Sequence, residues 1–168
     1  MIPRSASLAA ALLGALAVQA GAQNSANVNA TITITPSLTV TAVRDMDFGS
    51  VPQGVTNILI SQPEFDVRSA HVQVQAVVGE DVVAAFVLPT ELSDGAGHAI
   101  PITQFYGTFA AIGQSLISFT PTNQSVSPAA IVGTDGLLDL YLGAALNVSP
   151  NQFPATYMAV VQVSVFYN

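Results

Sequence analysis

Apolar side chains recur at every second position over much of this sequence. The clearest example spans 27–43, where valine, isoleucine, leucine and alanine alternate with threonine, serine and asparagine. Successive side chains of an extended chain point to opposite faces, so such a segment has one apolar face and one polar face. This pattern is typical of half-buried β-strands, and no stretch after residue 22 repeats apolar residues at helical spacing. The pattern predicts an all-β protein.

Turn-forming residues divide the chain into short strands. Pro36 cannot donate a hydrogen bond within a ladder, so we split the first segment at that residue. Clusters of glycine, proline, asparagine and aspartate separate the later segments. Short strands punctuated in this way predict one antiparallel β-sandwich or small barrel. The expected strands are 27–35, 37–43, 56–60, 70–78, 82–88, 100–106, 116–120, 137–142 and 156–167.

The first 22 residues carry a targeting pattern. Arg4 precedes an apolar run over about 6–18, and Ala20 and Ala22 supply the small residues that a signal peptidase accepts before Gln23. The run is shorter than the roughly 20 residues that a spanning helix needs. We therefore expect a signal peptide over 1–22, an N-terminal extension over 23–36 and a β-sandwich domain over 37–168. The predicted location is the periplasm, the cell surface or the extracellular space.

Charge composition excludes several classes of partner. The chain has three Lys plus Arg against ten Asp plus Glu, a net charge of −7, and no cysteine. Only Arg44 and Arg68 remain as cations after residue 22, so nucleic acids and anionic membrane surfaces are poor partners. Without cysteine no disulfide can form, and stability must come from the packed core.

The sequence offers no clear catalytic, cofactor or metal site. His71 shares its parity with glutamines on the polar face of a strand, and His98 follows a glycine-rich turn, so we expect both to be solvated. No local pattern places an acid beside either histidine, and no G-x-S-x-G elbow is present. Asp45 and Asp47 would share one face if they lay in a strand, a geometry that can bind Ca²⁺, but no oxygen-rich loop accompanies them. We predict a non-catalytic protein without a cofactor or metal.

Two short motifs resemble those of a family of exported bacterial all-β domains of unknown function. Its L-D-F-G opening is matched by Met46 followed by Asp47, Phe48 and Gly49. Its G-T-Y … V-x-V-x-Y-N close is matched by a final segment in which alanine replaces the glycine. The residues that carry this closing resemblance are Tyr157, Val163, Val165, Tyr167 and Asn168.

The same ending is similar to subunits of chaperone–usher pili, including the spore-coat-like branch. That resemblance implies an immunoglobulin-like sandwich that lacks its last strand and is completed by the N-terminal extension of the next subunit. It also implies self-association, a periplasmic assembly chaperone and a place in a fimbrium, although many such pilins have a disulfide that this chain lacks. The candidate donor strand lies in 27–35, with an apolar face formed by Val28, Ala30, Ile32 and Ile34.

Three interpretations of function remain open at this point. The first is a structural or adhesive fibre subunit that assembles by β-strand addition. The second is a self-contained secreted sandwich that binds a glycan or a protein. The third is a small outer-membrane barrel, for which eight alternating strands would suffice. The absence of tryptophan and of obvious aromatic girdles counts against the barrel.

Overall fold

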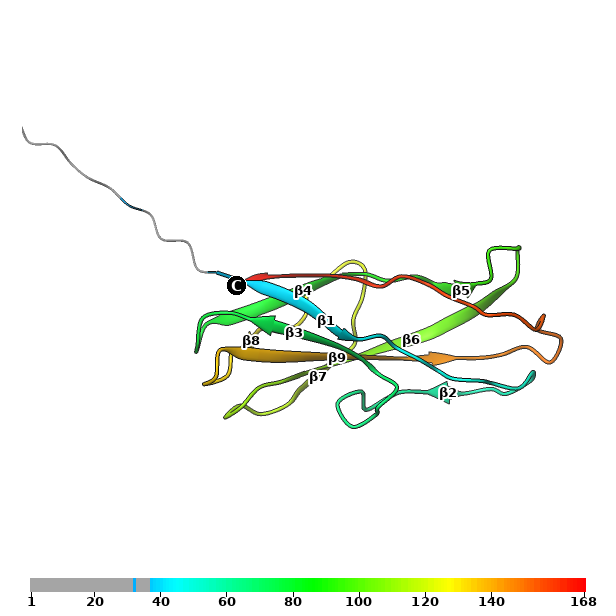
Figure 1. Ribbon diagram of the computed structural model, residues 1–168, viewed down its shortest axis with the longest axis horizontal. Helices are drawn as coiled ribbons and strands as arrows, with labels where there is room; N and C mark the ends of the chain where they lie inside the picture. Colours follow the sequence, from blue (N-terminus) through cyan, green and yellow to red (C-terminus); the bar gives the residue numbers. More distant parts are fainter. Residues whose placement is uncertain (1–31, 33–36) are drawn as a thin grey trace, which may run out of the picture. The chain divides into compact units, whose positions relative to one another are not determined.

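The computed structural model describes residue 32 and residues 37–168 (Figure 1). The expected signal peptide therefore lies outside the described residues. So do six residues singled out in the sequence: Ala20, Ala22, Gln23, Val28, Ala30 and Ile34. Of the candidate donor strand only Ile32 is described, and its side chain is 84% exposed.

The described part of the chain contains strands and no helix, so the all-β prediction is confirmed. Because no helix is present there, none of the described segments could cross a membrane as a helix. The strands are β1 (Thr39–Arg44), β2 (Ile58–Leu59), β3 (Ala70–Gln75), β4 (Asp81–Val87), β5 (Glu91–Ser93), β6 (Ala99–Ala110), β7 (Ile117–Phe119), β8 (Ala130–Ile131), β9 (Leu137–Leu146) and β10 (Gln162–Tyr167).

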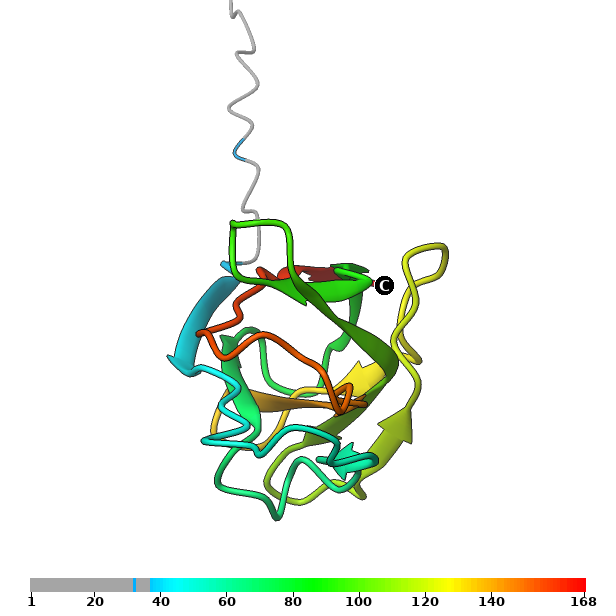
Figure 2. The same cartoon turned by 90° about the vertical axis from the view of Figure 1, so that its right-hand side faces the viewer.

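The strands form two antiparallel sheets. The larger has the order β1-β3-β9-β6-β5, with β2 added beside β9 and β7 added beside β6. The smaller has the order β10-β4-β8. Figure 2 views the molecule along its long axis and shows the strands of both sheets arranged around a common interior. This arrangement is consistent with a β-sandwich.

Both sheets contribute to one core. The smaller sheet supplies inward side chains of β4 and β8, and the larger supplies those of β3, β6 and β9, as the alternation of apolar residues requires. The buried members are Val74, Val82, Ala84, Phe86, Leu88, Phe105, Phe109, Ala130, Val132, Leu138, Leu140, Leu142 and Ala144. A second, smaller cluster at one end of the domain consists of Ile100, Leu146 and Val148.

Most expected strands are present, with shifted ends. The pairing of β6 with β9 runs from Ile102 opposite Leu146 to Ala110 opposite Asp139, so both strands are longer than the pattern indicated. The expected strand over 56–60 is reduced to two residues, and that over 156–167 is regular only from residue 162. The short strands β5 and β8 were not predicted, because two or three residues cannot display a period of two.

Candidate functional site

The strands β1 and β10 are neighbouring open edges of the two sheets. Among the described residues, β1 pairs only with β3, and β10 pairs only with β4. Figure 1 shows the two strands running in opposite directions, with the C-terminal end of β10 beside the start of β1. An edge strand leaves a row of backbone N–H and C=O groups available to another chain. This pair of edges is therefore the candidate site.

The inward face of β10 is incompletely covered. In the ladder between β10 and β4, Val163 lies opposite Phe86 and Val165 lies opposite Ala84. Both β4 residues are at most 5% exposed, whereas both valines are only half-buried although they pack against the same core. The difference arises because β4 is covered on its other side by β8 and by the segment around Ser127, which bonds Ala84, whereas β10 has a neighbour on one side only. The inward side chains of β10 are therefore partly exposed to solvent, although the core residues beneath them are buried.

The facing edge of β1 shows the same incomplete cover. Leu38, just before the strand, packs against the core but remains half-buried. Val40, which shares its parity, is 39% exposed. Beyond the strand, Met46 and Phe48 also contact the core as half-buried residues. Partly exposed apolar side chains thus lie along both edges, and we call this surface the open strip: Leu38, Val40, Val163 and Val165.

Tyr167 joins the two edges at one end of this strip. Its hydroxyl donates a hydrogen bond to the carbonyl oxygen of Ser37 (3.0 Å) and accepts one from the backbone N–H of Val77 (3.1 Å). The register that pairs Thr39 with Gln75 would bring Ser37 opposite Val77. The hydroxyl therefore sits between two backbone groups that would otherwise face each other. Tyr167 thus links the end of β10, in the smaller sheet, to the residues just before β1 and just after β3, in the larger sheet.

The residues of the opening and closing motifs have structural contacts. The Asp47 carboxylate accepts the N–H of Gly49 (2.8 Å), and Gly49 has a φ of 69°, which glycine adopts without strain. Phe48 and Tyr157, which are far apart in the sequence, pack against the same small cluster. The structure thus brings Phe48 of the opening motif and Tyr157 of the closing motif to the same cluster, whereas the rest of the closing motif lies along β10.

His71 is less solvated than expected. It does lie on the outer, polar face of β3, but its side chain is only 16% exposed. The ring lies 2.7 Å from an Asp139 carboxylate oxygen and stacks on Tyr141 with centroids 4.5 Å apart. Burial and the Asp139 charge raise the pKa of the Tyr141 hydroxyl, whereas Arg44 acts in the opposite direction. The pairing of β3 with β9 supplies this acid, so no local sequence pattern could reveal it.

His98 also has an acidic partner, contrary to expectation. Its Nδ1 lies 2.6 Å from the Asp94 carboxylate, and its ring stacks on Phe153 at 4.5 Å. The hydrogen bond from His98 lowers the pKa of Asp94 to about 2, assisted by the backbone N–H groups of Ala96 and His98. The spacing of four residues around a glycine-rich turn was the signal that could have indicated this pair. In the described part of the chain, no serine or threonine hydroxyl is hydrogen-bonded to either histidine ring.

The structure also corrects the expected carboxylate pair. Asp45 and Asp47 lie beyond the last residue of β1, so they do not share the face of a strand. The ladder with β3 is irregular near its end and stops at Arg44, whose guanidinium donates hydrogen bonds to the carbonyl oxygen and the hydroxyl of Ser69. Within residue 32 and residues 37–168, no three His, Cys, Asp or Glu side chains gather in a group suited to a metal ion.

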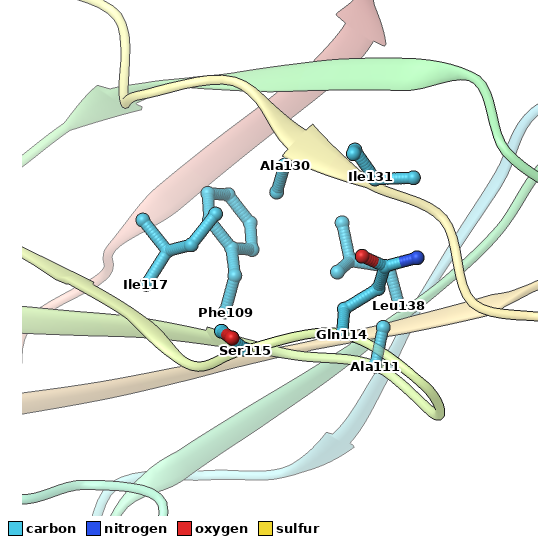
Figure 3. A pocket seen from close by; sticks show the side chains of 8 residues that line it. All are labelled: Phe109, Ala111, Gln114, Ser115, Ile117, Ala130, Ile131 and Leu138. Atoms are coloured by element: carbon cyan, nitrogen blue, oxygen red, sulfur yellow. The ribbon is translucent and has the colours of Figure 1, made fainter.

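Two hollows lie away from the open edges. One, of about 160 Å³, opens between the β6–β7 hairpin and β8 (Figure 3). Figure 3 shows apolar side chains around it, together with Gln114 and Ser115. This volume is below the roughly 300–1,000 Å³ of typical small-molecule sites. The other, of about 360 Å³, is a shallow depression beside Leu59 and Phe65.

Comparisons with protein-family models, curated proteins and solved structures found no match to this chain.

Proposed function

We propose that this protein is an exported, non-catalytic structural subunit that assembles into a surface fibre by β-strand addition. In this proposal, residues 27–35 of one copy pair with the β1 and β10 edges of another. The completed domain would be immunoglobulin-like. The observation that carries the proposal is the half-buried inward face of β10, which contacts the core but lacks a covering strand.

The sequence before the domain contains a segment suited to that edge. Val28, Ala30, Ile32 and Ile34 share one parity, while asparagine and threonine occupy the other. Burial of the three large aliphatic side chains would contribute roughly 5–9 kcal/mol, as an upper bound. That is comparable with the whole stability of a domain, about 5–15 kcal/mol.

Strand addition suits both partners chemically. An added strand forms main-chain hydrogen bonds with an open edge, and its alternate side chains fill the pockets beneath it. The open strip along β1 and β10 carries valine and leucine side chains, which can pack against the apolar side chains of 27–35. A periplasmic chaperone that covers the same edges before assembly belongs to this proposal.

The test compares two substitutions in the added segment. Ile32→Asp places a charge on the apolar parity, whereas Thr33→Asp places the same charge on the polar parity. We expect wild type and Thr33→Asp to form heat-resistant oligomers and Ile32→Asp to remain unassembled, as measured by size-exclusion chromatography at matched concentrations. A wild type that runs as a stable monomer would overturn the proposal.

A second candidate function, a binding module for a glycan or a protein, is favoured by the loop between β2 and β3. Phe65 is 74% exposed and Val67 is 80% exposed on this loop. The loop is held by Arg68, which binds the Asp66 carboxylate at 2.6 Å, and by Arg44, which binds Ser69. Large apolar side chains on a braced loop are typical of contact surfaces.

Affinity electrophoresis through gels that contain soluble polysaccharides tests this second candidate. We expect a polysaccharide that retards the wild type to lose its effect on Phe65→Ala. Val126→Ala, which truncates an exposed side chain on the segment between β7 and β8, is the control. If neither neutral nor acidic polysaccharides change the mobility of the wild type, glycan binding by this loop is excluded.

A further inference from the structure

We infer that the outer face of the smaller sheet is a self-association surface, on which a second copy of this chain docks sheet against sheet around a twofold axis. The inference goes beyond the proposed function, since it uses neither the open strip nor the segment before the domain. It is carried by the described residues of β4, β8 and β10 and of the segments that flank them.

The alternation of side chains decides which residues form this face. Val165 of β10 and Phe86 of β4 pack in the core, so their neighbours along each strand point outward. Tyr157 and Val161 pack inward in the same way, which turns the residues between and beside them outward. Six large apolar side chains on this face are 41–84% exposed, and we call them the apolar outer face: Val87, Val126, Ile131, Met158, Val160 and Phe166.

The apolar outer face differs in charge from the other outer surface of the domain. Of the charged side chains in the described part of the chain, the alternation places only Asp81 on it, at the end beside Ile131. The outer face of the larger sheet instead carries His71, Gln73 and Asp139, which are joined by hydrogen bonds. Exposed apolar side chains gathered on one face of a soluble domain mark a contact surface.

The chemistry of this face indicates its occupant. It offers no cation to a nucleic acid or an anionic lipid, and it holds none of the tryptophan, tyrosine, lysine or arginine side chains that anchor proteins at a membrane interface. Branched aliphatic side chains on a sheet pack well against a second sheet about 10 Å away. The chain has a net charge of −7, so two copies repel each other except where their contact is uncharged. A second copy of the apolar outer face meets these conditions.

A twofold axis makes the face complementary to itself, because each half then contacts the other half of its copy. An axis that lies in the plane of the sheet and crosses the strands brings the Asp81 end of one copy to the Met158 end of the other. The two Asp81 carboxylates then lie far apart, at opposite margins of the contact. An axis along the strands would place the two carboxylates opposite each other, where like charges repel. We therefore expect the two β10 strands to run in opposite directions.

The size of the face predicts a reversible dimer. The face spans 158–166, about 30 Å at about 3.3 Å per residue, and three strands about 4.8 Å apart, so it covers about 400 Å². Stable interfaces usually bury about 800 Å² on each partner. The dimer should therefore dissociate on dilution, in contrast with the heat-resistant oligomers expected from strand addition.

Val160→Asp tests the inference, with Val67→Asp as the matched control. The two valines are 84% and 80% exposed, so both variants should fold, but Val67 lies on the loop between β2 and β3. Each is combined with Ile32→Asp, so that strand addition does not mask a weaker contact. We expect Ile32→Asp alone to show a monomer–dimer equilibrium in sedimentation velocity. Val160→Asp should raise the dimer Kd by about tenfold or more, because it buries a charge, whereas Val67→Asp should change it by less than about twofold.

Cross-linking tests the geometry of the contact without adding a charge. The chain has no cysteine, so Ser164→Cys introduces a single thiol, close to the middle of the face opposite Ala85. A short bifunctional maleimide should join two such copies into a covalent dimer. Thr41→Cys, at an exposed position of β1 in the larger sheet, is the control and should give much less dimer.

The outcomes that overturn the inference are distinct. They are an Ile32→Asp protein that stays monomeric at every concentration, equal weakening by the two aspartates, and association that continues beyond a dimer. Binding to phosphatidylcholine vesicles that is lost in Val160→Asp, without a dimer, would assign the face to a membrane and would also overturn it. If Ile32→Asp itself forms heat-resistant oligomers, the proposed function is wrong, and the cross-linking still decides: equal yields from Ser164→Cys and Thr41→Cys overturn the inference.

Discussion

The backbone of Ile60 passes directly over Gly143, and its carbonyl oxygen occupies the space that a Cβ at Gly143 would need. The Ile60 side chain is fully buried, and its N–H donates to the carbonyl oxygen of Ala144 at 3.0 Å. Gly143 is thus required by this close approach of the chain to β9. The contact also anchors the segment that leads from β2 into the loop with Phe65.

Gly143→Ala should destabilise the domain through this contact. We expect the free energy of unfolding to fall by about 3 kcal/mol or more, because the added Cβ would collide with the Ile60 backbone and neither backbone can move without disturbing β9. Gly79→Ala is the control: its Cβ would meet no atom within 4 Å, and its φ of 78° should cost only about 1–2 kcal/mol. Urea denaturation measures both. Equal losses in the two variants would contradict the role given to the contact.

The Asp94–His98 pair should make stability depend on acid pH. The pKa of Asp94 in the folded protein is lowered from 3.8 to about 2, mainly by the hydrogen bond from His98. A carboxyl whose pKa is lower when folded adds stability above its unfolded pKa, and this stability is lost as pH falls through the folded pKa. We therefore expect the contribution of this pair to disappear between about pH 4 and pH 2.

Asp94→Asn measures that contribution. The asparagine oxygen can still accept the backbone N–H groups of Ala96 and His98, but it carries no charge and does not titrate. The variant should lose less stability than the wild type between pH 4 and pH 2, as followed by urea denaturation at each pH. Asp45→Asn, in an exposed position beyond β1, is the control. A slope in Asp94→Asn equal to that of the wild type would contradict the assignment.

Trypsin should cut the folded protein slowly at Arg44 and Arg68. Arg44 lies in β1 with its guanidinium bound to Ser69, and Arg68 is held by the Asp66 carboxylate, whose pKa is lowered by that hydrogen bond. Asp66→Ala should release the loop and accelerate cleavage at Arg68 more than at Arg44. Mass spectrometry of the fragments identifies the site. Rapid cleavage of the wild type at both arginines would show that this region is mobile.

Much of the fold followed from the two-residue period, because that period reports which side chains face a core. It indicated strands close to β1, β3, β4, β7 and β10, with shifted ends. It failed where local pattern and pairing disagree: the residues around Met158 alternate, yet only an isolated bridge to Ser93 forms there. The ends of strands depend on their neighbours, which a local pattern does not contain.

The contacts at the candidate site were less predictable. The alternation along β10 was visible, but its half-burial follows from the order of strands in the smaller sheet. The bond between Tyr167 and Ser37 likewise requires knowing that the end of β10 lies beside the start of β1. The Asp139 partner of His71 depends on the β3–β9 register. Such relationships are tertiary, whereas the Asp94–His98 pair was local and could have been found.

A synthetic peptide of residues 27–35 should bind the open edges when the protein's own segment is disabled. In full-length Ile32→Asp, the inward valines of β10 remain available while the substituted segment competes poorly. A ligand that binds only the folded state stabilises it by RT ln(1 + [L]/Kd), about 2.7 kcal/mol at a concentration 100 times the Kd. We therefore expect the wild-type peptide to raise the melting temperature in a concentration-dependent way.

Two controls make this prediction specific. A peptide carrying the Ile32→Asp change should give no stabilisation, whereas one carrying Thr33→Asp should act like the wild-type peptide, because only the apolar parity meets the core. Val165→Asp, introduced into the protein beside Ile32→Asp, should abolish the effect by placing a charge on the inward face of β10, where Val165 contacts the core. Stabilisation that survives this change in a folded protein would place the peptide at another surface.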